Sequence, residues 1–207
     1  MFAPESLAPS SATGLTGKAG VLIYGEGYPL RQNVAVPLSD DFSPSATELL
    51  LNNATFVSQF GDVGLALAPL LHLAIVACMD SRMDIFQMLG LKHGDAHIIR
   101  NAGGVVTDDV VRSLVVSQRL LNTQEIILVH HTDCGLQKIS EDGFKDEIEE
   151  ECGTRPPWFI EAFNDPFDAV RESMKRLRNN PFVKYKKNIR GFVYDVETGA
   201  LLEVSAS

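Results

Sequence analysis

The sequence predicts an α/β fold with a mostly parallel central β-sheet flanked by helices, preceded by an N-terminal arm. Residues 73–78, 96–100 and 125–130 are predicted strands, and the first and third are continuous apolar runs typical of strands buried on both faces. Helical segments joined by short links separate these strands, as right-handed crossovers require. We expect one domain over residues 45–207, because a chain of 207 residues suits a single core, and a flexible tail and arm over residues 1–44.

The N-terminal part is predicted from composition. Residues 1–17 are rich in Ser, Ala, Pro and Gly, which is typical of a flexible tail. Val21–Tyr24 and Val34–Pro37 resemble short extended pieces of an arm that would lie on the main body or on a neighbouring subunit. A helix is predicted over Ser45–Phe60, because Ser45 and Glu48 have the spacing of a capping box.

The central elements follow in the order that a parallel sheet needs. The apolar strand Leu73–Cys78 leads through a helical piece, Met83–Leu89, to a second strand, Ala96–Arg100. The glycines of Asn101–Gly104 interrupt that strand. Thr107 is then a suitable N-cap for a helix that extends to about Leu121, with two aspartates in its first turn.

The last elements complete the sheet. Glu125–His130 is a third buried strand, rich in Ile, Leu and Val. Asp165 is a predicted cap for a helix over Pro166–Asn179 that begins with proline. Ile189–Val196 and Ala200–Val204 are joined by a Glu-Thr-Gly turn and are predicted to form a terminal hairpin or a strand with a short partner.

Composition excludes several classes of function. The net charge of −9 argues against a nucleic-acid partner, because phosphate binding needs a basic field. The longest apolar stretch, residues 63–77, is interrupted by Gly, Pro and His, so we expect no membrane span. Three cysteines cannot form a dense disulfide framework, and the N-terminus lacks a secretory signal pattern. We therefore expect a reducing, cytoplasmic location, where cysteines often bind metal.

Three residues form a candidate zinc site. Cys78 ends the first buried strand, and His131 and Cys134 follow the third strand at H-x-x-C spacing. The carboxyl ends of neighbouring parallel strands share one edge of a sheet, so these residues are expected to converge there. Two thiolates and one imidazole suit tetrahedral zinc, and three protein ligands leave a fourth position for water, as in catalytic sites.

Asp80 and Arg82 add a candidate catalytic pair. Arg82 can hold the Asp80 carboxylate in a charge-assisted contact and keep it ionised. Bound zinc lowers the pKa of its water enough to give hydroxide at neutral pH, and Asp80 would accept the proton of that hydroxide in a hydrogen bond. If Asp80 instead bound the zinc as a fourth ligand, it would displace the water and switch the site off.

The motifs resemble those of the β-class carbonic anhydrases. The matching segments are Cys78–Arg82, Arg100–Gly104 and His130–Gly135, and the ending Ile189–Asp195 is similar to that of the short microbial branch. The resemblance implies a β-carbonic-anhydrase-like fold, a homodimer or higher even homo-oligomer, and partner residues that help line the pocket. It also implies the same site residues: zinc on Cys78, His131 and Cys134, and an Asp80–Arg82 dyad.

The resemblance leaves two substrates open, because the family also contains carbonyl sulfide hydrolases and carbon disulfide hydrolases with the same metal motifs. The first hypothesis is reversible hydration of CO₂ to bicarbonate. The second is hydrolysis of carbonyl sulfide to CO₂ and H₂S on the same zinc site, since both molecules are small and linear. In either case the partner is a small-molecule substrate.

Two hypotheses from other classes remain. A non-catalytic zinc protein would have no need of a carboxylate that orients hydroxide, which argues against that class. A thiol enzyme with Cys78 as nucleophile is disfavoured, because the phosphatase pattern has five residues between Cys and Arg, whereas three separate Cys78 from Arg82.

Other residues carry weaker predictions. Gly103 and Gly104 could offer N–H groups to the substrate, or could be simple turn glycines. His130 could relay protons or could be an ordinary histidine at a strand end, and Asp133 is expected to stabilise its loop. Cys152 is expected to be an ordinary thiol. No role is predicted for the remaining loop histidines His93 and His97.

Overall fold

The computed structural model describes residues 46–205 of the chain. The predictions for the tail and for the two extended pieces of the arm lie outside the described residues. The predicted first helix is present as α1 (Ala46–Gln59), none of whose residues is buried. A boundary between two units of the structure falls within α1, after Ala54, so the predicted division at residue 45 stays a prediction.

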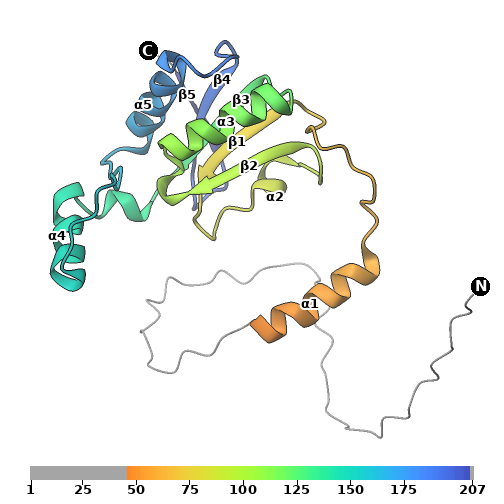
Figure 1. The fold of residues 1–207 in the computed structure, drawn as a ribbon, viewed down its shortest axis with the longest axis horizontal. Helices are drawn as coiled ribbons and strands as arrows, with labels where there is room; N and C mark the ends of the chain where they lie inside the picture. The colour runs from red at the N-terminus through yellow and green to blue at the C-terminus, as the bar shows by residue number, and fades with distance from the viewer. Residues whose placement is uncertain (1–45, 206–207) are drawn as a thin grey trace, which may run out of the picture. The chain divides into compact units, whose positions relative to one another are not determined.

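A five-stranded sheet forms the centre of the second unit (Figure 1). Its strand order is β2-β1-β3-β4-β5, and the first four strands are parallel while β5 is antiparallel to β4. This arrangement confirms the predicted fold class and the terminal strand pair. The bounds are Leu73–Cys78 for β1, Ala96–Asn101 for β2, Glu125–His131 for β3, Ile189–Tyr194 for β4 and Leu201–Val204 for β5.

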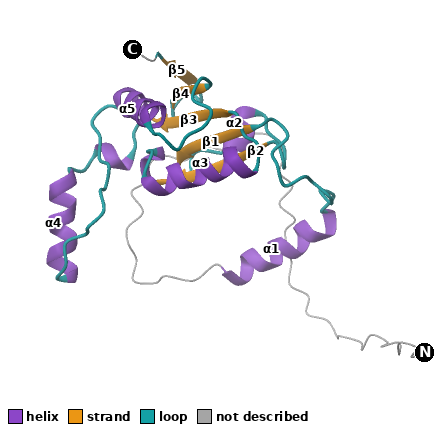
Figure 2. Ribbon diagram, turned by 45° about the horizontal axis from the view of Figure 1, so that its top comes forward, coloured by secondary structure: helices purple, strands orange, loops and turns teal. Residues whose placement is uncertain are grey.

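Helices cover both faces of the sheet (Figure 2). Alternate residues of β1 belong to two separate apolar clusters, because successive side chains of a strand point to opposite faces. Ala74 and Val76 pack in the cluster that contains residues of α3 and α5. Ile75 and Ala77 pack in the other cluster, which includes Ile85 of α2. The bounds are Ile85–Leu89 for α2, Asp108–Leu120 for α3 and Pro166–Asn179 for α5, with short 3-10 turns at Ala102–Gly104 (η1) and Gly135–Gln137 (η2).

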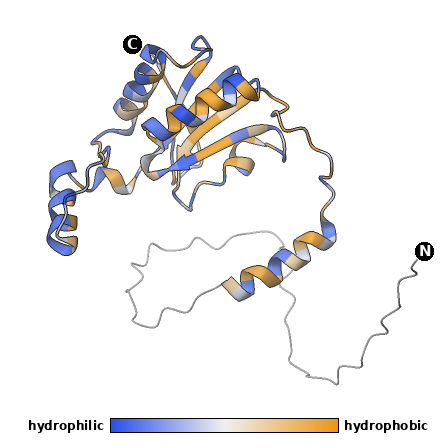
Figure 3. Ribbon diagram, viewed as in Figure 1, coloured by the Kyte–Doolittle hydropathy of each residue, from blue (hydrophilic) through white to orange (hydrophobic). Residues whose placement is uncertain are grey.

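One helix was not predicted from the sequence. α4 (Glu141–Cys152) begins after Ser140, whose side chain accepts a hydrogen bond from the backbone N–H of Gly143 at 3.2 Å. Lys145 is its only buried residue. Figure 3 shows that α4 is largely hydrophilic whereas β1 is hydrophobic along its length. Because α4 carries no wide apolar stripe, its sequence lacks the periodicity that predicts a helix.

The ends of β1 and β3 bring the candidate metal ligands to one edge. β1 pairs with β3 in parallel, with Ala77 opposite Val129, so the two strands end beside each other. Cys78 is the last residue of β1 and His131 the last of β3, one residue beyond the predicted end. The described helices include none that is long and apolar enough to span a bilayer.

Candidate metal centre

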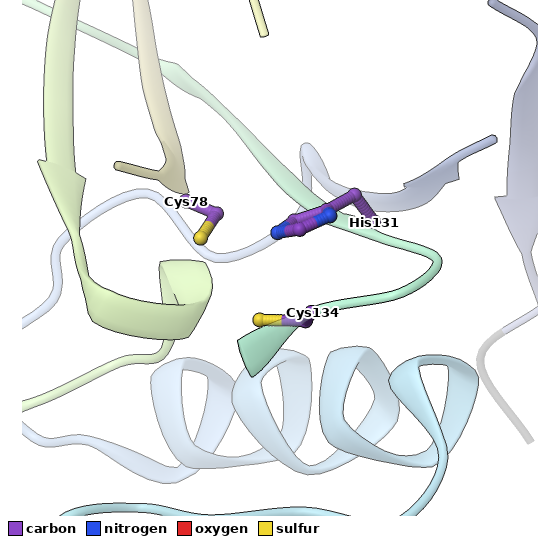
Figure 4. A group of neighbouring side chains, drawn as sticks. All are labelled: Cys78, His131 and Cys134. Atoms are coloured by element: carbon purple, nitrogen blue, oxygen red, sulfur yellow. The ribbon is translucent and has the colours of Figure 1, made fainter. Parts of the chain in front are cut away.

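Three side chains form a donor cluster at the carboxyl edge of the sheet. Cys78, His131 and Cys134 each offer one ligand atom, and these atoms lie within 4.8 Å of one another. All three residues are buried. Figure 4 shows both sulfur atoms and the edge of the imidazole ring turned toward a common point. The two loops predicted to converge therefore do so, and the described residues contain a cluster able to bind a metal.

The loop after β3 is shaped to present Cys134. Asp133 has a φ of 53°, a left-handed conformation that non-glycine residues seldom adopt, and it turns the chain sharply. The backbone N–H of Cys134 then donates to Oε1 of Gln137 at 2.9 Å. Thr132 donates its backbone N–H to the carbonyl of Tyr194 at 2.9 Å and so ties the start of this loop to β4. The position of Cys134 is thus fixed by its neighbours.

The imidazole of His131 is oriented to act as a ligand through Nε2. Nδ1 of His131 lies 2.8 Å from the carbonyl oxygen of Thr132, so Nδ1 carries the hydrogen and donates it. Nε2 is then left with a lone pair. That atom is buried and has no hydrogen-bond partner among the described residues. A buried acceptor without a donor is costly, and a bound cation between it and the two sulfurs would satisfy it.

The two thiols differ in their protonation. The pKa of Cys78 is lowered to about 4, chiefly by a hydrogen bond from the Cys134 thiol, against the opposing effect of burial. The pKa of Cys134 is raised, because its proton is held against the Cys78 sulfur and because the group is buried. A thiolate is the form of cysteine that binds metal. The donor set of two sulfurs and one nitrogen therefore fits a borderline divalent ion such as zinc, and three protein donors leave a position free.

Asp80 stands beside the cluster and pairs with Arg82. Nε of Arg82 donates to Oδ1 of Asp80 at 2.9 Å, and Nη2 donates to Oδ2 at 2.8 Å. These hydrogen bonds lower the pKa of Asp80 to about 2, so the carboxylate is ionised at neutral pH. Oδ2 of Asp80 lies 3.7 Å from Nε2 of His131. The Asp80 carboxylate thus lies beside the donor cluster, and the Arg82 guanidinium binds both of its oxygens.

Arg82 also binds the second loop of the site. Its Nη1 donates to Oδ2 of Asp133 at 2.9 Å, and its Nη2 donates to the carbonyl of Asp133 at 3.0 Å. Lys138 contacts the other carboxylate oxygen of Asp133 at 2.7 Å. One guanidinium therefore ties the loop of Cys78 to the loop of Cys134. This agrees with the expectation that Asp133 stabilises its loop.

Arg100 is a site residue for which no role was predicted from the sequence. Its Nε donates to the carbonyl of Cys78 at 2.9 Å, and its Nη2 donates to the carbonyl of Asp80 at 2.6 Å. It thereby fixes the backbone that carries one metal donor and the carboxylate. Its place near the end of β2, at the same sheet edge, was the signal that could have identified it.

The two glycines of η1 differ in their surroundings. Gly103 lines the cavity beside the donor cluster. Gly104 is buried, and a Cβ there would lie 2.8 Å from the backbone nitrogen of Cys78 and 3.0 Å from the carbonyl oxygen of Val129. Gly104 thus lets η1 lie directly against β1 and β3. The predicted contact with substrate fits the position of Gly103 better than that of Gly104.

An apolar cavity of about 640 Å³ opens onto the cluster. Cys78, Asp80 and Cys134 lie on its inner side. Its outer wall comes from the residue Ile139 just before α4, from α4 and from the segment after it, a part of the chain for which no structure was predicted. The wall residues are Ile139, Phe144, Trp158, Phe159 and Ile160. These side chains offer an apolar surface to a small uncharged molecule, and two of them, Trp158 and Phe159, are 56% and 74% exposed.

The remaining candidates are not members of the donor cluster. His130 is fully buried with its ring 5.6 Å from that of Phe163, and burial lowers its pKa to about 4. His97 contacts the hydroxyl of Ser117 through Nδ1 at 2.7 Å. The other two are His93, which pairs with Asp62, and Cys152, which is exposed.

The family profile and two of the three similar proteins compared with this chain are carbonic anhydrases, and the third is a carbon disulfide hydrolase. The sequence profile described as "Carbonic anhydrase" matches residues 73–163. "Beta-carbonic anhydrase 1" of Mycobacterium tuberculosis is 53% identical over 158 residues, which are 76% of this chain and 96% of that protein. A carbon disulfide hydrolase of Saccharolobus solfataricus is 34% identical over 154 residues, covering 63% of this chain and 76% of that protein. The crystal structure of a carbonic anhydrase from Streptococcus mutans superposes with a TM-score of 0.75 at 40% identity, covering 79% of this chain and 99% of that chain.

Proposed function

We propose that this chain, which belongs to the β-carbonic anhydrase family, catalyses the reversible hydration of CO₂ to bicarbonate. Its membership of the family follows from 53% identity to a relative of which it covers 96%. The observation that carries the proposal is the cluster of Cys78, His131 and Cys134 with the Asp80 carboxylate 3.7 Å from the imidazole. The metal is proposed to be zinc, because a set of two thiolates and one imidazole is typical of zinc sites.

The protein groups have separate tasks in this reaction. Cys78, His131 and Cys134 would hold the metal and leave one position free. Zinc, when bound, supplies Lewis acidity that lowers the pKa of a water molecule toward neutrality. Asp80 is ionised and accepts a hydrogen bond from the nucleophile, so that a lone pair is directed at the carbon of CO₂. Arg82 keeps that carboxylate in place through two hydrogen bonds.

The cavity supports the choice of substrate. CO₂ is linear and has no net charge, so an apolar space accepts it more readily than it accepts an ion. The wall residues Trp158, Phe159 and Ile160 would offer the molecule an apolar surface beside the donors. Gly103 is proposed to contact the substrate because it lines the same cavity.

A second candidate is hydrolysis of carbonyl sulfide, a linear molecule of the same kind. The observation that favours it is the 34% identity to a carbon disulfide hydrolase, whose substrate carries sulfur in place of oxygen. The same donors and the same carboxylate would serve. The two candidates differ in product, because only the second releases H₂S.

The deciding experiment supplies each gas to the purified, zinc-loaded protein. Stopped-flow measurement with a pH indicator follows proton release from CO₂, and a sulfide assay follows carbonyl sulfide. Rapid proton release with little sulfide supports CO₂ hydration. Rapid sulfide release with negligible CO₂ hydration would replace the first proposal by the second.

Assembly and location complete the proposal. An even homo-oligomer is supported by family membership and by large exposed apolar side chains such as Leu67, Leu70 and Phe182. Sedimentation velocity tests it, and a monomer at micromolar concentration would count against it. The cytoplasm is proposed because the cluster needs reduced thiols, and Cys78, Cys134 and Cys152 are all free. Localisation of a tagged chain in its own cell tests that assignment.

A further inference from the structure

The Glu141 side chain binds the backbone of the cavity wall. Its Oε1 accepts a hydrogen bond from the N–H of Ile160 at 3.0 Å. Its Oε2 lies 3.1 Å from the same N–H and accepts from the N–H of Glu161 at 3.0 Å. Glu141 is the first residue of α4, so a side chain on the helix holds two peptide groups 19 and 20 residues further along the chain.

Lys145 provides a second attachment one helical turn away. Its Nζ lies 2.8 Å from Oε1 of Glu141, and its side chain is 11% exposed. The same Nζ lies 4.8 Å from the ring centroid of Phe159, as in a cation–π contact. Lys145 therefore compensates the charge of Glu141 and also holds a wall residue next to the peptides that Glu141 binds.

The wall segment depends on these contacts because it has no regular secondary structure. Residues 153–165 form neither helix nor strand. Glu161 has a φ of 62°, which is unfavourable for a residue with a Cβ. Beyond that point, the Glu161 carboxylate accepts from Nη1 of Arg176 on α5 at 2.8 Å. Glu141 thus ties the segment to α4 at Ile160 and Glu161, and Arg176 ties it to α5. Two further contacts hold its ends, because Arg155 pairs with acidic side chains of α4 and the carbonyl of Asn164 accepts from Nε2 of Gln137.

The same segment faces the donor cluster. Ile160 is packed in the apolar cluster that contains Cys78 and Cys134. Trp158 and Phe159 line the cavity on which these residues open. A movement of Trp158–Ile160 would therefore change the shape of the cavity next to two of the donors.

We propose that Glu141 is a positioning residue, which holds Trp158–Ile160 as part of the outer wall of the substrate cavity. The inference rests on the proposed hydration of a small linear substrate, and it concerns how that substrate is confined. Glu141 does not touch the donors. It acts through the peptides of Ile160 and Glu161, and Lys145 keeps its charge compensated.

Trp158 allows the wall to be observed directly, because it is the only tryptophan of the chain. Quenching of its fluorescence by acrylamide, measured on the zinc-loaded protein, reports how accessible the wall is. Trp158 is 56% exposed in the wild-type wall, so Glu141→Ala should raise the quenching constant above the wild-type value by a limited amount. Glu141→Gln retains one acceptor oxygen for the two N–H groups, so its quenching should lie between the wild type and Glu141→Ala.

Asp142→Asn is the matched control. Asp142 is also in the first turn of α4, so its removal has a similar effect on the helix dipole. It binds Arg155 at 3.1 Å, and Arg155 keeps contacts with two other carboxylates, Asp146 and Glu149. The control variant should have wild-type quenching and wild-type kinetics.

Steady-state kinetics of CO₂ hydration separate positioning from a purely structural role. If Glu141 holds the wall, Glu141→Ala should raise KM several-fold at unchanged zinc content, with a smaller change in kcat. A purely structural role would reduce the fraction of active protein, which lowers kcat and leaves KM constant. Quenching and KM equal to the wild type in Glu141→Ala would overturn the proposal.

The quenching result does not require activity. If neither gas is turned over while Glu141→Ala still releases Trp158, the proposed function fails and the anchoring of the wall stands. If the wild type hydrates CO₂ and Glu141→Ala changes neither observable, the proposed function stands and the positioning role fails.

Discussion

Oδ2 of Asp80 lies 3.7 Å from Nε2 of His131, the one ring nitrogen of that residue left free to bind a cation. Arg82 holds the carboxylate there with two hydrogen bonds. The distance leaves the carboxylate beside the donor cluster and paired to the guanidinium. A group in that place is suited to orient a nucleophile bound between the donors.

Loss of a donor should remove the metal. Cys134→Ser replaces a thiolate by a hydroxyl, a poor zinc ligand, so the purified variant should contain far less than one zinc per chain and have no measurable activity. Metal content by plasma mass spectrometry checks this. Cys152→Ser is the control, because that thiol is exposed and is not a member of the cluster, and it should retain both zinc and activity. Full zinc in Cys134→Ser would contradict the assignment.

Loss of the Asp80 charge should leave the metal and reduce the rate. Asp80→Asn keeps the size of the side chain, but the amide is uncharged, and its nitrogen donates hydrogen bonds where a carboxylate oxygen would accept one. We expect kcat/KM for CO₂ to fall about 100-fold or more at neutral pH, with zinc content unchanged. Asp109→Asn, an exposed change in the first turn of α3 that removes the charge paired with Arg112, should have wild-type kinetics. Unchanged kinetics in Asp80→Asn would rule out the role proposed for this carboxylate.

The close approach at Gly104 should make it sensitive to a single methyl group. Gly104 has a φ of 70°, and its added Cβ would lie 2.8 Å from the backbone of Cys78. Gly153 also has a φ of 70°, with nothing within 4 Å of its added Cβ, so Gly153→Ala isolates the cost of the conformation. Urea unfolding should give a loss of about 1 to 2 kcal/mol for Gly153→Ala and a larger loss for Gly104→Ala. Equal losses would show that η1 can move away from the strands.

The ion pair between β4 and β5 should give a pH-dependent stability that is independent of the metal site. Nε and Nη2 of Arg190 donate to the two oxygens of Glu203 at 2.7 and 2.8 Å, and they lower the pKa of Glu203 in the folded protein. A lowered folded-state pKa means that this stabilisation is present above the unfolded value of about 4.3 and is lost as pH falls through the folded value.

Glu203→Gln tests that pair by its melting temperature. The variant should melt slightly below the wild type at pH 7, because exposed pairs contribute little, and the difference should shrink toward zero as the pH is lowered below about 4. A difference that stays constant with pH would show that the charge of Glu203 is not its cause. The comparison uses the same buffer series for both proteins.

The convergence of the metal donors could be predicted from the sequence because it follows from topology. Two apolar strands in a parallel sheet must end at the same edge, and Cys78 and His131 are the last residues of β1 and β3. Cys134 follows at a spacing that one tight turn can close. The apolar runs of β1 and β3 and the parallel topology of the sheet therefore predict the same convergence of the three donors.

The cavity wall could not be predicted in this way. α4 buries only Lys145, so it carries no apolar stripe, and the segment after it is held by side chains such as Glu141 rather than by a backbone ladder. The contact of Arg82 with Asp133 spans 51 residues and depends on the exact turn after β3. Contacts of this kind come from tertiary structure, and no local pattern encodes them.

The central claim is that two sulfurs and one ring nitrogen share a single metal ion, and X-ray absorption at the zinc edge tests it most directly. The account predicts two sulfur neighbours at about 2.3 Å and nitrogen or oxygen neighbours at about 2.0 to 2.1 Å, in the purified wild-type protein. It also predicts one sulfur neighbour fewer in any residual metal of Cys134→Ser. A zinc ion surrounded only by oxygen and nitrogen, or a protein purified without a transition metal that also fails to take up zinc, would contradict it.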